Sequence, residues 1–249
     1  MKKYTPTQIR FLAIRTLGNF LVLGSILGMF LTFGPAVKTE IEYRYNKWKG
    51  VTYVVADDLP QDQNISPTFT PTEASGPTPK QNVFFSDILA RQPTVQVLSP
   101  VDTEFGIVIP KIAANTKVIS DVDASNYDEY IEALREGVAH ALGTYFPGEQ
   151  GNIYLFAHST DNFWNVGRYN AVFYLLKELE AGDEVDLYYQ GIRHRYTVTQ
   201  REIVDPDDTH FLTDAKDTET LTLQTCWPPG TTLKRLIVVA KPVSDLQDN

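Results

Sequence analysis

The feature that most constrains this chain is an uncharged run of 22 residues from Thr16 to Val37. A helix of about 20 apolar residues spans the hydrocarbon core of a bilayer, and Gly34-Pro35 is expected to end it. A cleaved signal peptide would have a shorter apolar region, of roughly 7–15 residues, before a small-residue cleavage site. Because this run is longer and no A-x-A pattern follows it, we predict an uncleaved transmembrane anchor within residues 1–37.

The charges that flank the run leave its orientation almost undecided. Positive residues normally mark the cytoplasmic side. Four cations precede the run and four follow it: Lys2, Lys3, Arg10 and Arg15, then Lys38, Arg44, Lys47 and Lys49. Residues 37–249 form an acidic body, with 18 Lys and Arg against 31 Asp and Glu. We predict a single-pass protein of the cell membrane, with a cytoplasmic N-terminus and the body outside, partly because the resemblance given below requires it.

Residues 38–100 are predicted to connect the anchor to the body. Residues 38–56 have an amphipathic mix that is typical of helical or extended structure. Residues 57–82 are rich in Pro, Ser, Thr, Gln and Asn and poor in apolar residues. Such a stretch buries too little surface to offset its ordering entropy, so we predict a flexible linker that acts as a stalk.

From about Phe105 short apolar runs recur between Gly, Pro, Asn and Asp, and they are rich in β-branched and aromatic residues. Gln190-Gly191 is typical of a hairpin turn, and helices are expected at Tyr127–Arg135 and Tyr169–Leu179. Many strands with few helices indicate a sandwich or a closed barrel. The six predicted strands are FGIVIP, NIYLFAH, EVDLYYQ, RYTVTQREIV, LTLQTC and RLIVVAKPV.

The composition excludes several classes of function. An acidic body without a Lys and Arg cluster is a poor partner for nucleic acid. A single cysteine rules out an intramolecular disulfide and disfavours a Cys-based zinc site. The histidines lack metal-binding spacing, and the acidic cluster of Asp205, Asp207 and Asp208 matches no calcium loop. We therefore expect no metal and no cofactor.

Three residues at predicted strand ends are candidates for nucleophilic catalysis. Cys226 ends LTLQTC and precedes Pro228-Pro229-Gly230; a lone cysteine is more often a small buried hydrophobe. His158 ends NIYLFAH, where an imidazole could favour thiolate and pass a proton to a departing amine. Arg235 opens the next strand, and an antiparallel return would bring it near Cys226 to stabilise an oxyanion. Considered alone, His158 is interpreted as a structural histidine at a strand end and Arg235 as a charged residue at the rim of the fold.

In combination, these motifs resemble the sortase family. TLQTC at 222–226 matches its T-L-x-T-C signature, GVAHALGTYFPGEQGNIYLFAHS at 137–159 matches the run that leads to its histidine, and Arg235 follows in the family's order. The resemblance covers roughly residues 103–243. It implies a mainly β fold, a closed barrel of about eight strands with short helices, and we place this catalytic domain at 101–245.

The resemblance also implies a function. Cys226 would attack a carbonyl of an LPxTG-like sorting signal on a surface protein to form a thioacyl-enzyme, with His158 transferring protons and Arg235 steadying the oxyanion. An amine from a peptidoglycan precursor or a pilin lysine would then accept the acyl group. Thr225 and Trp227, beside the cysteine, are candidate substrate-binding residues. His140 matches a family position outside the catalytic trio and is read as structural; His194 and His210 match nothing and are read as exposed or loop residues.

The subclass and two alternative functions stay open at this point. The N-terminal linker lacks the Asp-Pro-aromatic lid of pilin-polymerising sortases, and no second apolar span follows the last strand. A housekeeping or class D/E-like type is therefore favoured. A hydrolytic cysteine endopeptidase on the same fold would share the acyl-enzyme, and a membrane-tethered barrel that only binds would have an unreactive cysteine.

Overall fold

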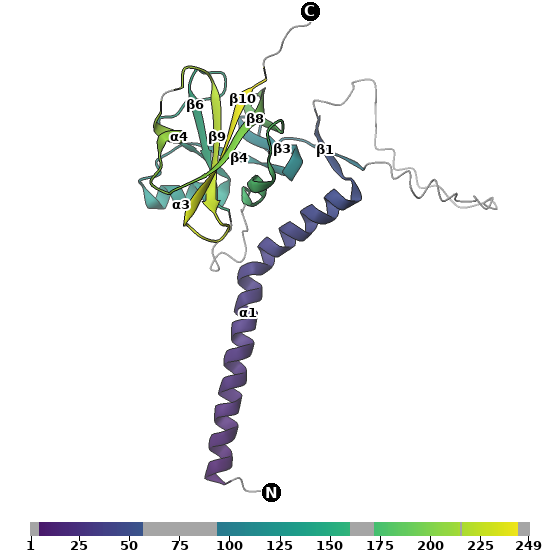
Figure 1. The fold of residues 1–249 in the computed structure, drawn as a ribbon, viewed down its shortest axis with the longest axis vertical. Coiled ribbons are helices and arrows are strands. Elements are labelled where there is room, and N and C mark those ends of the chain that lie inside the picture. The colour runs from purple at the N-terminus through teal and green to yellow at the C-terminus, as the bar shows by residue number, and fades with distance from the viewer. Residues whose placement is uncertain (1–4, 57–93, 160–171, 215, 244–249) are drawn as a thin grey trace, which may run out of the picture.

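The computed structural model of the chain describes residues 5–56, 94–159, 172–214 and 216–243. It consists of a long N-terminal helix that leads to a β-barrel (Figure 1). The predicted linker at 57–82 lies outside the described residues, so that prediction is not tested.

Eight strands close into a barrel in the order β10-β8-β7-β3-β4-β5-β6-β9. The closed, mainly β fold expected from the sequence is thereby confirmed. Closure pairs both edges of every barrel strand, so the described barrel has no open edge. The strands are β3 (Phe105–Ile109), β4 (Ala114–Val122), β5 (Val138–Ala141), β6 (Asn152–Phe156), β7 (Glu184–Tyr189), β8 (Ile192–Val204), β9 (Thr220–Trp227) and β10 (Lys234–Pro242).

Short helices fill the connections between strands. They are η2 (Pro110–Ile112), α3 (Tyr127–Glu136), η4 (Tyr174–Glu178) and α4 (His210–Thr213). The barrel core is lined by residues without exposed surface, among them Ile107, Leu155, Leu187 and Leu223. Because β3 and β6 are buried along their whole length, the elements packed outside them complete a continuous apolar core.

A small two-stranded parallel sheet covers one side of the barrel. Its strands are β1 (Thr52–Val55) and β2 (Val95–Leu98). Val55 of β1 is fully buried against Val108 of β3 and Tyr188 of β7. The segment that follows the N-terminal helix is therefore part of the folded body, although the sequence analysis assigned it to the connection.

The N-terminal helix α1 runs without interruption from Pro6 to Lys49. Thr5 caps it in a reciprocal hydrogen-bonded pair with Gln8, and Gly50 ends it with the left-handed φ of 71° that glycine tolerates. The predicted stop at Gly34-Pro35 was wrong. Figure 1 shows α1 bent between its two halves, and a proline inside a helix, which lacks an amide hydrogen, bends the helix without ending it.

Residues Pro6–Leu31 of α1 are long and apolar enough to cross a membrane. Their length and composition fit a single-pass anchor, as the uncharged run predicted. The other predicted elements are confirmed except one. The hairpin turn has positive φ at Gln190 (51°) and Gly191 (77°), and α3 matches its prediction. The helix expected at Tyr169–Leu179 is a short 3-10 turn in its described part.

Candidate active site

Two adjacent antiparallel strands bring Cys226 and Arg235 together. Arg235 of β10 is the direct cross-strand partner of Cys226 of β9. The connecting loop contains Gly230, whose φ of 82° lies in the left-handed region that glycine tolerates. The antiparallel return predicted from the sequence is therefore present. Directly paired residues project to the same face of a sheet, so the thiol and the guanidinium share one side of the barrel wall.

His158 reaches the same place along a parallel pair of strands. Phe156 of β6 is paired with Gln224 of β9. The Ala157 amide donates to the Gln224 carbonyl at 3.1 Å, and Thr225 Oγ1 donates to the Ala157 carbonyl at 2.9 Å. These bonds extend the register past the end of β6, so His158 lies level with Cys226.

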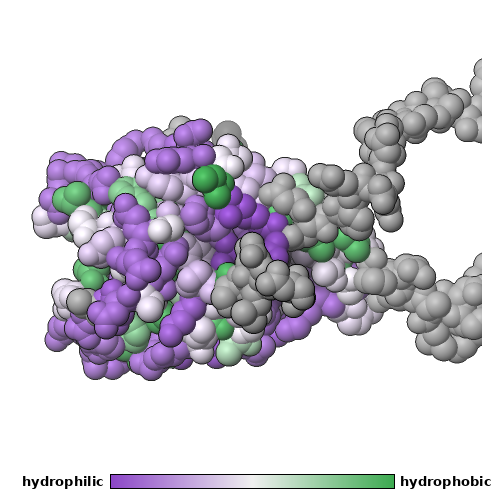
Figure 2. Space-filling view, turned by 90° about the horizontal axis from the view of Figure 1, so that it is seen from above, coloured by the Kyte–Doolittle hydropathy of each residue, from purple (hydrophilic) through white to green (hydrophobic). Residues whose placement is uncertain are grey.

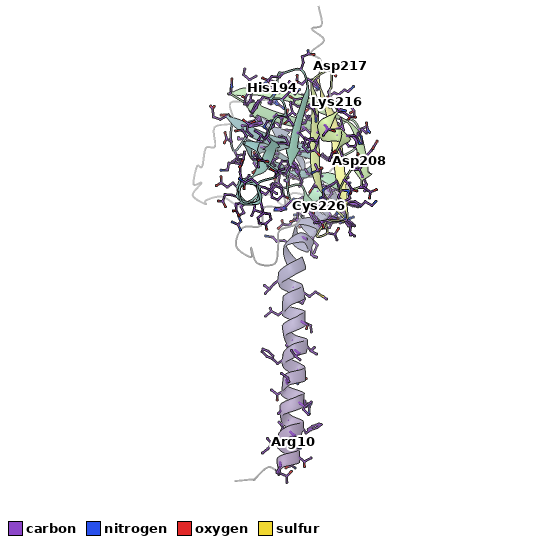
Figure 3. The ribbon with its side chains drawn as sticks, turned by 90° about the vertical axis from the view of Figure 1, so that its left-hand side faces the viewer. Arg10, His194, Asp208, Lys216, Asp217 and Cys226 are labelled. Carbon is purple, nitrogen blue, oxygen red and sulfur yellow. The ribbon has the colours of Figure 1, made fainter. Side chains whose placement is uncertain are left out.

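A groove of about 310 Å³ joins the three side chains. Cys226 is half-buried in its wall, so the thiol is held in place yet reachable. Figure 3 places Cys226 at the end of the barrel nearest to α1. The groove is lined from β5, β6, β9 and β10, from α3 and the residues before it, and from the segment around α4. Its lining residues are Ala124, Tyr130, Ala141, Tyr154, Phe156, Ala157, His158, Pro206, Asp208, Thr209, Leu212, Gln224, Thr225, Cys226 and Arg235.

The Arg235 guanidinium is held by the loop that precedes its strand. Its Nη1 donates to the carbonyls of Thr232 and Lys234, both at 3.1 Å. The guanidinium is planar and permanently charged, and it has further N–H donors besides the two on Nη1. Lys234 instead pairs with Asp205, and strand alternation places it on the opposite face from Arg235.

The two chain neighbours of Cys226, Thr225 and Trp227, have different surroundings. Thr225 is 3% exposed and lines the groove, but its hydroxyl is used in bonding the Ala157 carbonyl. Trp227 is half-buried, packs against the barrel core and is not among the groove-lining residues. The geometry therefore favours a structural use for both side chains in this state.

Tyr130 is a groove residue that the sequence analysis did not identify. Its ring stacks on Phe156, with centroids 5.7 Å apart, and meets the His158 ring edge-on at 6.3 Å. Burial raises the pKa of Tyr130, and the neighbouring Cys226 raises it further. The phenol therefore stays protonated beside the imidazole. Its position on α3, 28 residues before His158, gave no local signal.

Polar contacts also fix the strands and the α4 segment that surround the groove. Tyr154 Oη donates to Gln224 Oε1 at 2.6 Å, and burial raises the pKa of Tyr154. Buried Asn152 donates to the carbonyl of Phe211 in α4 and accepts from Thr222, both at 2.8 Å. Asn152 thus ties α4, which lies over one side of the groove, to the barrel wall.

The other three histidines lie outside the groove. His140 has no exposed surface, and Asp121, Thr144 and Tyr145 surround its two ring nitrogens, which agrees with a structural role. His194 is half-buried in β8, so its loop assignment was wrong, and it lies at the barrel end away from Cys226 (Figure 3). His210 opens α4 and bonds Asp208. Among the described residues no group of three or more His, Cys, Asp and Glu could hold a metal ion.

This arrangement has the parts needed for nucleophilic acyl transfer. A thiol needs a base to become thiolate and a proton donor for the leaving group, and an imidazole can serve both needs. A guanidinium fixed beside the thiol is suited to a developing oxyanion.

Residues 107–243, more than half of the chain, match the family model described as Sortase domain. Sortase D of Bacillus subtilis (strain 168) is 33% identical over 139 residues, which are 55% of this chain and 62% of that protein. The match thus spans less than two thirds of that relative.

Solved structures of the same kind also match. A Sortase D5 transpeptidase of Clostridium perfringens is 26% identical, with 57% of this chain and 79% of that chain covered and a TM-score of 0.46. A lid mutant of Sortase A from Corynebacterium diphtheriae is 26% identical, with 59% and 74% covered and a TM-score of 0.47. Clostridium perfringens sortase C with its C-terminal cell wall sorting motif is 26% identical, with 55% and 69% covered and a TM-score of 0.46.

Proposed function

This chain belongs to the sortase family, and from that premise we propose that it is a membrane-anchored cysteine transpeptidase with Cys226 as nucleophile. The observation that carries the proposal is the pairing of Arg235 with Cys226 across β9 and β10, beside His158 in one groove. The three residue types at a common site supply nucleophile, proton carrier and oxyanion partner.

The proposed reaction has two acyl-transfer steps. The Cys226 thiolate attacks the Thr carbonyl of an LPxTG-like signal, and Arg235 stabilises the oxyanion that forms. The Thr–Gly bond breaks, the leaving amine takes a proton from His158, and a thioester remains on Cys226. An incoming amine then attacks the thioester, gives a proton to His158 and releases the sulfur, so that a new amide replaces the one that was cut.

The partners and location follow from the same proposal. The acyl donors are surface proteins that bear a sorting signal, and the acceptor is an amine of a peptidoglycan precursor or a pilin lysine. The clostridial sortase C solved with its sorting motif supports a peptide donor of this kind. The N-terminus lies in the cytoplasm, and the barrel, within the proposed domain 101–245, lies outside. The similarity to Sortase D supports a class D/E-like type.

The roles proposed for Thr225 and Trp227 are narrower than a direct bond to substrate. Thr225 forms part of the groove wall through its methyl-bearing face while its hydroxyl bonds Ala157. Trp227 anchors the end of β9 against the core. We propose that both hold the backbone on either side of Cys226 and act on substrate through that placement.

The experiment is a peptide ligation assay with the full chain in detergent micelles. The full chain is needed because β1 packs on the barrel wall. An LPxTG-type peptide and triglycine are added, and mass spectrometry follows the products of the wild type and of Cys226→Ala. A ligated product that requires Cys226 supports transpeptidation, whereas free acid alone indicates a hydrolase.

The same assay can refute the proposal. Turnover that persists in Cys226→Ala would remove the proposed nucleophile. If no peptide reacts and a mild alkylating reagent also leaves Cys226 unlabelled in the native protein, the barrel is a binding module and the enzyme assignment is wrong. Labelling of Cys226 without turnover shows a reactive thiol and directs the search to other sorting signals.

A further inference from the structure

The second half of α1 has an apolar stripe that nothing in the described structure covers. Val37, Ile41, Tyr45 and Trp48 are 52%, 61%, 50% and 69% exposed. Their spacing of four, four and three residues places them on one face of a helix. Large apolar side chains in a contiguous exposed row on a folded protein mark an interaction surface.

The opposite face of this helical segment is occupied by the barrel. Glu40 forms an ion pair with Lys177 of η4 at 2.8 Å, and each side chain is about four-fifths buried. Tyr43 packs against the barrel core, and Asn46 donates to Tyr53 of β1 at 3.0 Å. Because these contacts fix the rotation of the helix, the apolar stripe points away from the barrel.

Cations and aromatic rings border the stripe in the way that suits a lipid interface. Lys38, Arg44 and Lys49 lie on its two flanks. Lys38 pairs with Glu42 and Arg44 with Glu40 along the helix, whereas Lys49 Nζ lies 4.4 Å from the ring centroid of Tyr45. The Tyr45 and Trp48 rings are 6.1 Å apart. Tyr and Trp concentrate at membrane interfaces, and long basic side chains extend from an apolar surface to reach anionic headgroups.

The stripe continues directly from the predicted membrane span. The same helix contains the apolar stretch Pro6–Leu31, and a bend separates it from the segment that carries the stripe (Figure 1). The barrel lies on the side of the bent segment away from that stretch. Figure 2, which views the barrel from the far end, shows a mainly hydrophilic surface with isolated apolar patches. Because the stripe points away from the barrel, and the barrel lies away from Pro6–Leu31, the stripe is on the side of the bent segment that faces Pro6–Leu31.

We propose that residues 37–49 of α1 lie in the headgroup layer of the membrane as an interfacial helix, with Val37, Ile41, Tyr45 and Trp48 inserted to the acyl boundary. The partner is a bilayer surface that contains anionic lipid. The inference rests on the proposed membrane anchoring. Because Glu40 and Tyr43 join this segment to the barrel, it sets the orientation of the barrel, with the Cys226 end of the groove facing the bilayer (Figure 3).

The test measures the depth of Trp48 in vesicles of phosphatidylcholine and phosphatidylglycerol. The full chain carries Trp164→Phe and Trp227→Phe, so that Trp48 is the only tryptophan. Lipids brominated near the headgroup end or deep in the acyl chain quench from inside the bilayer, and acrylamide quenches from water. Circular dichroism verifies the fold; if the variant does not fold, the difference between wild type and Trp48→Phe isolates the same signal.

We expect the shallow brominated lipid to quench Trp48 most and acrylamide to quench it weakly. In a matched control, Trp48→Phe and Ile192→Trp are added to this variant, which moves the tryptophan to an exposed site two residues from His194. That tryptophan should respond to acrylamide and not to brominated lipid.

Two other outcomes would overturn the inference, and flotation of the vesicles separates them. If the chain floats with the vesicles but Trp48 responds only to acrylamide, the anchor holds and the interfacial helix is wrong. If the chain does not float, the anchoring itself is wrong and the inference fails with it.

Discussion

Tyr130 of α3 lies stacked on Phe156 of β6, with an angle of 15° between the rings, and its edge contact to His158 places an aromatic wall behind the imidazole. Tyr130 lies outside the proposed catalytic trio, yet its ring contacts both Phe156 and His158. We infer that it positions His158.

Two substitutions of Tyr130 should therefore distinguish the contribution of its ring from that of its hydroxyl. Aromatic pairs contribute about 0.5–1.5 kcal/mol, so Tyr130→Ala should lower kcat by about tenfold with a smaller effect on KM. Tyr130→Phe keeps the ring contacts and should retain most of the activity. The ligation assay gives both constants; a Phe variant as impaired as the Ala variant would shift the role to the hydroxyl.

Arg235→Lys should lower kcat by about 100-fold or more, in the range seen when one oxyanion partner is removed. A lysine keeps the charge but cannot both bond the Thr232 and Lys234 carbonyls and present a planar donor. Lys234→Ala is the matched control, because it removes the adjacent cation and an exposed ion pair with Asp205. Such pairs contribute roughly 0–1 kcal/mol, so near-wild-type turnover is expected there. Equal losses in both variants would contradict the role of Arg235.

Asn152→Ala should loosen α4 over the groove. The change leaves the Phe211 carbonyl and the Thr222 hydroxyl without their partner, which costs about 1–3 kcal/mol for buried groups. We expect a lower melting temperature and a raised KM, since Leu212 and Thr209 near α4 line the groove. Combined with Thr222→Val, the loss should be less than additive. Strict additivity in thermal unfolding would show that the two residues act independently.

The sequence predicted the closed, mainly β fold but not every strand of the barrel. Cys226, His158 and Arg235 each end or open a run of β-branched residues, and their order along the chain carried the family resemblance. The barrel strands β4 and β5 were missed. β5 has only four residues, VAHA, and β4 mixes polar and apolar positions because it is only partly buried. Tertiary pairing, which sequence periodicity does not report, creates both strands.

Residues placed by tertiary contact could not be found in the same way. Tyr130 reaches the groove only because α3 packs beside β6, and the α4 segment does so through Asn152. The helix was predicted to stop at Gly34-Pro35, because this pair commonly marks a helix end. Inside a long helix the lost hydrogen bond is tolerated as a bend, and the amphipathic residues beyond it form one exposed stripe because the helix continues to Lys49.

The pH dependence of stability should report the buried state of His140. Burial lowers its pKa below the ordinary value near 6.5. Its Nδ1 accepts from the Asp121 amide at 3.3 Å, and Nε2 lies 3.0 Å from the Tyr145 carbonyl, to which it donates in the neutral ring. At pH values between this lowered pKa and about 6.5, His140 is therefore mostly protonated in the unfolded chain and mostly neutral in the folded protein.

The contribution of neutral His140 to the free energy of unfolding is therefore fully present above about pH 6.5. It is lost as the pH falls from there towards the lowered pKa. His140→Asn keeps an acceptor for the Asp121 amide but does not titrate. The variant should be less stable than wild type at pH 7.5 by about 1–3 kcal/mol, and the difference should shrink towards pH 5. Urea unfolding of both proteins across this range measures it. Parallel pH curves would mean that His140 takes up its proton in the folded protein as readily as in the unfolded chain, contrary to its burial.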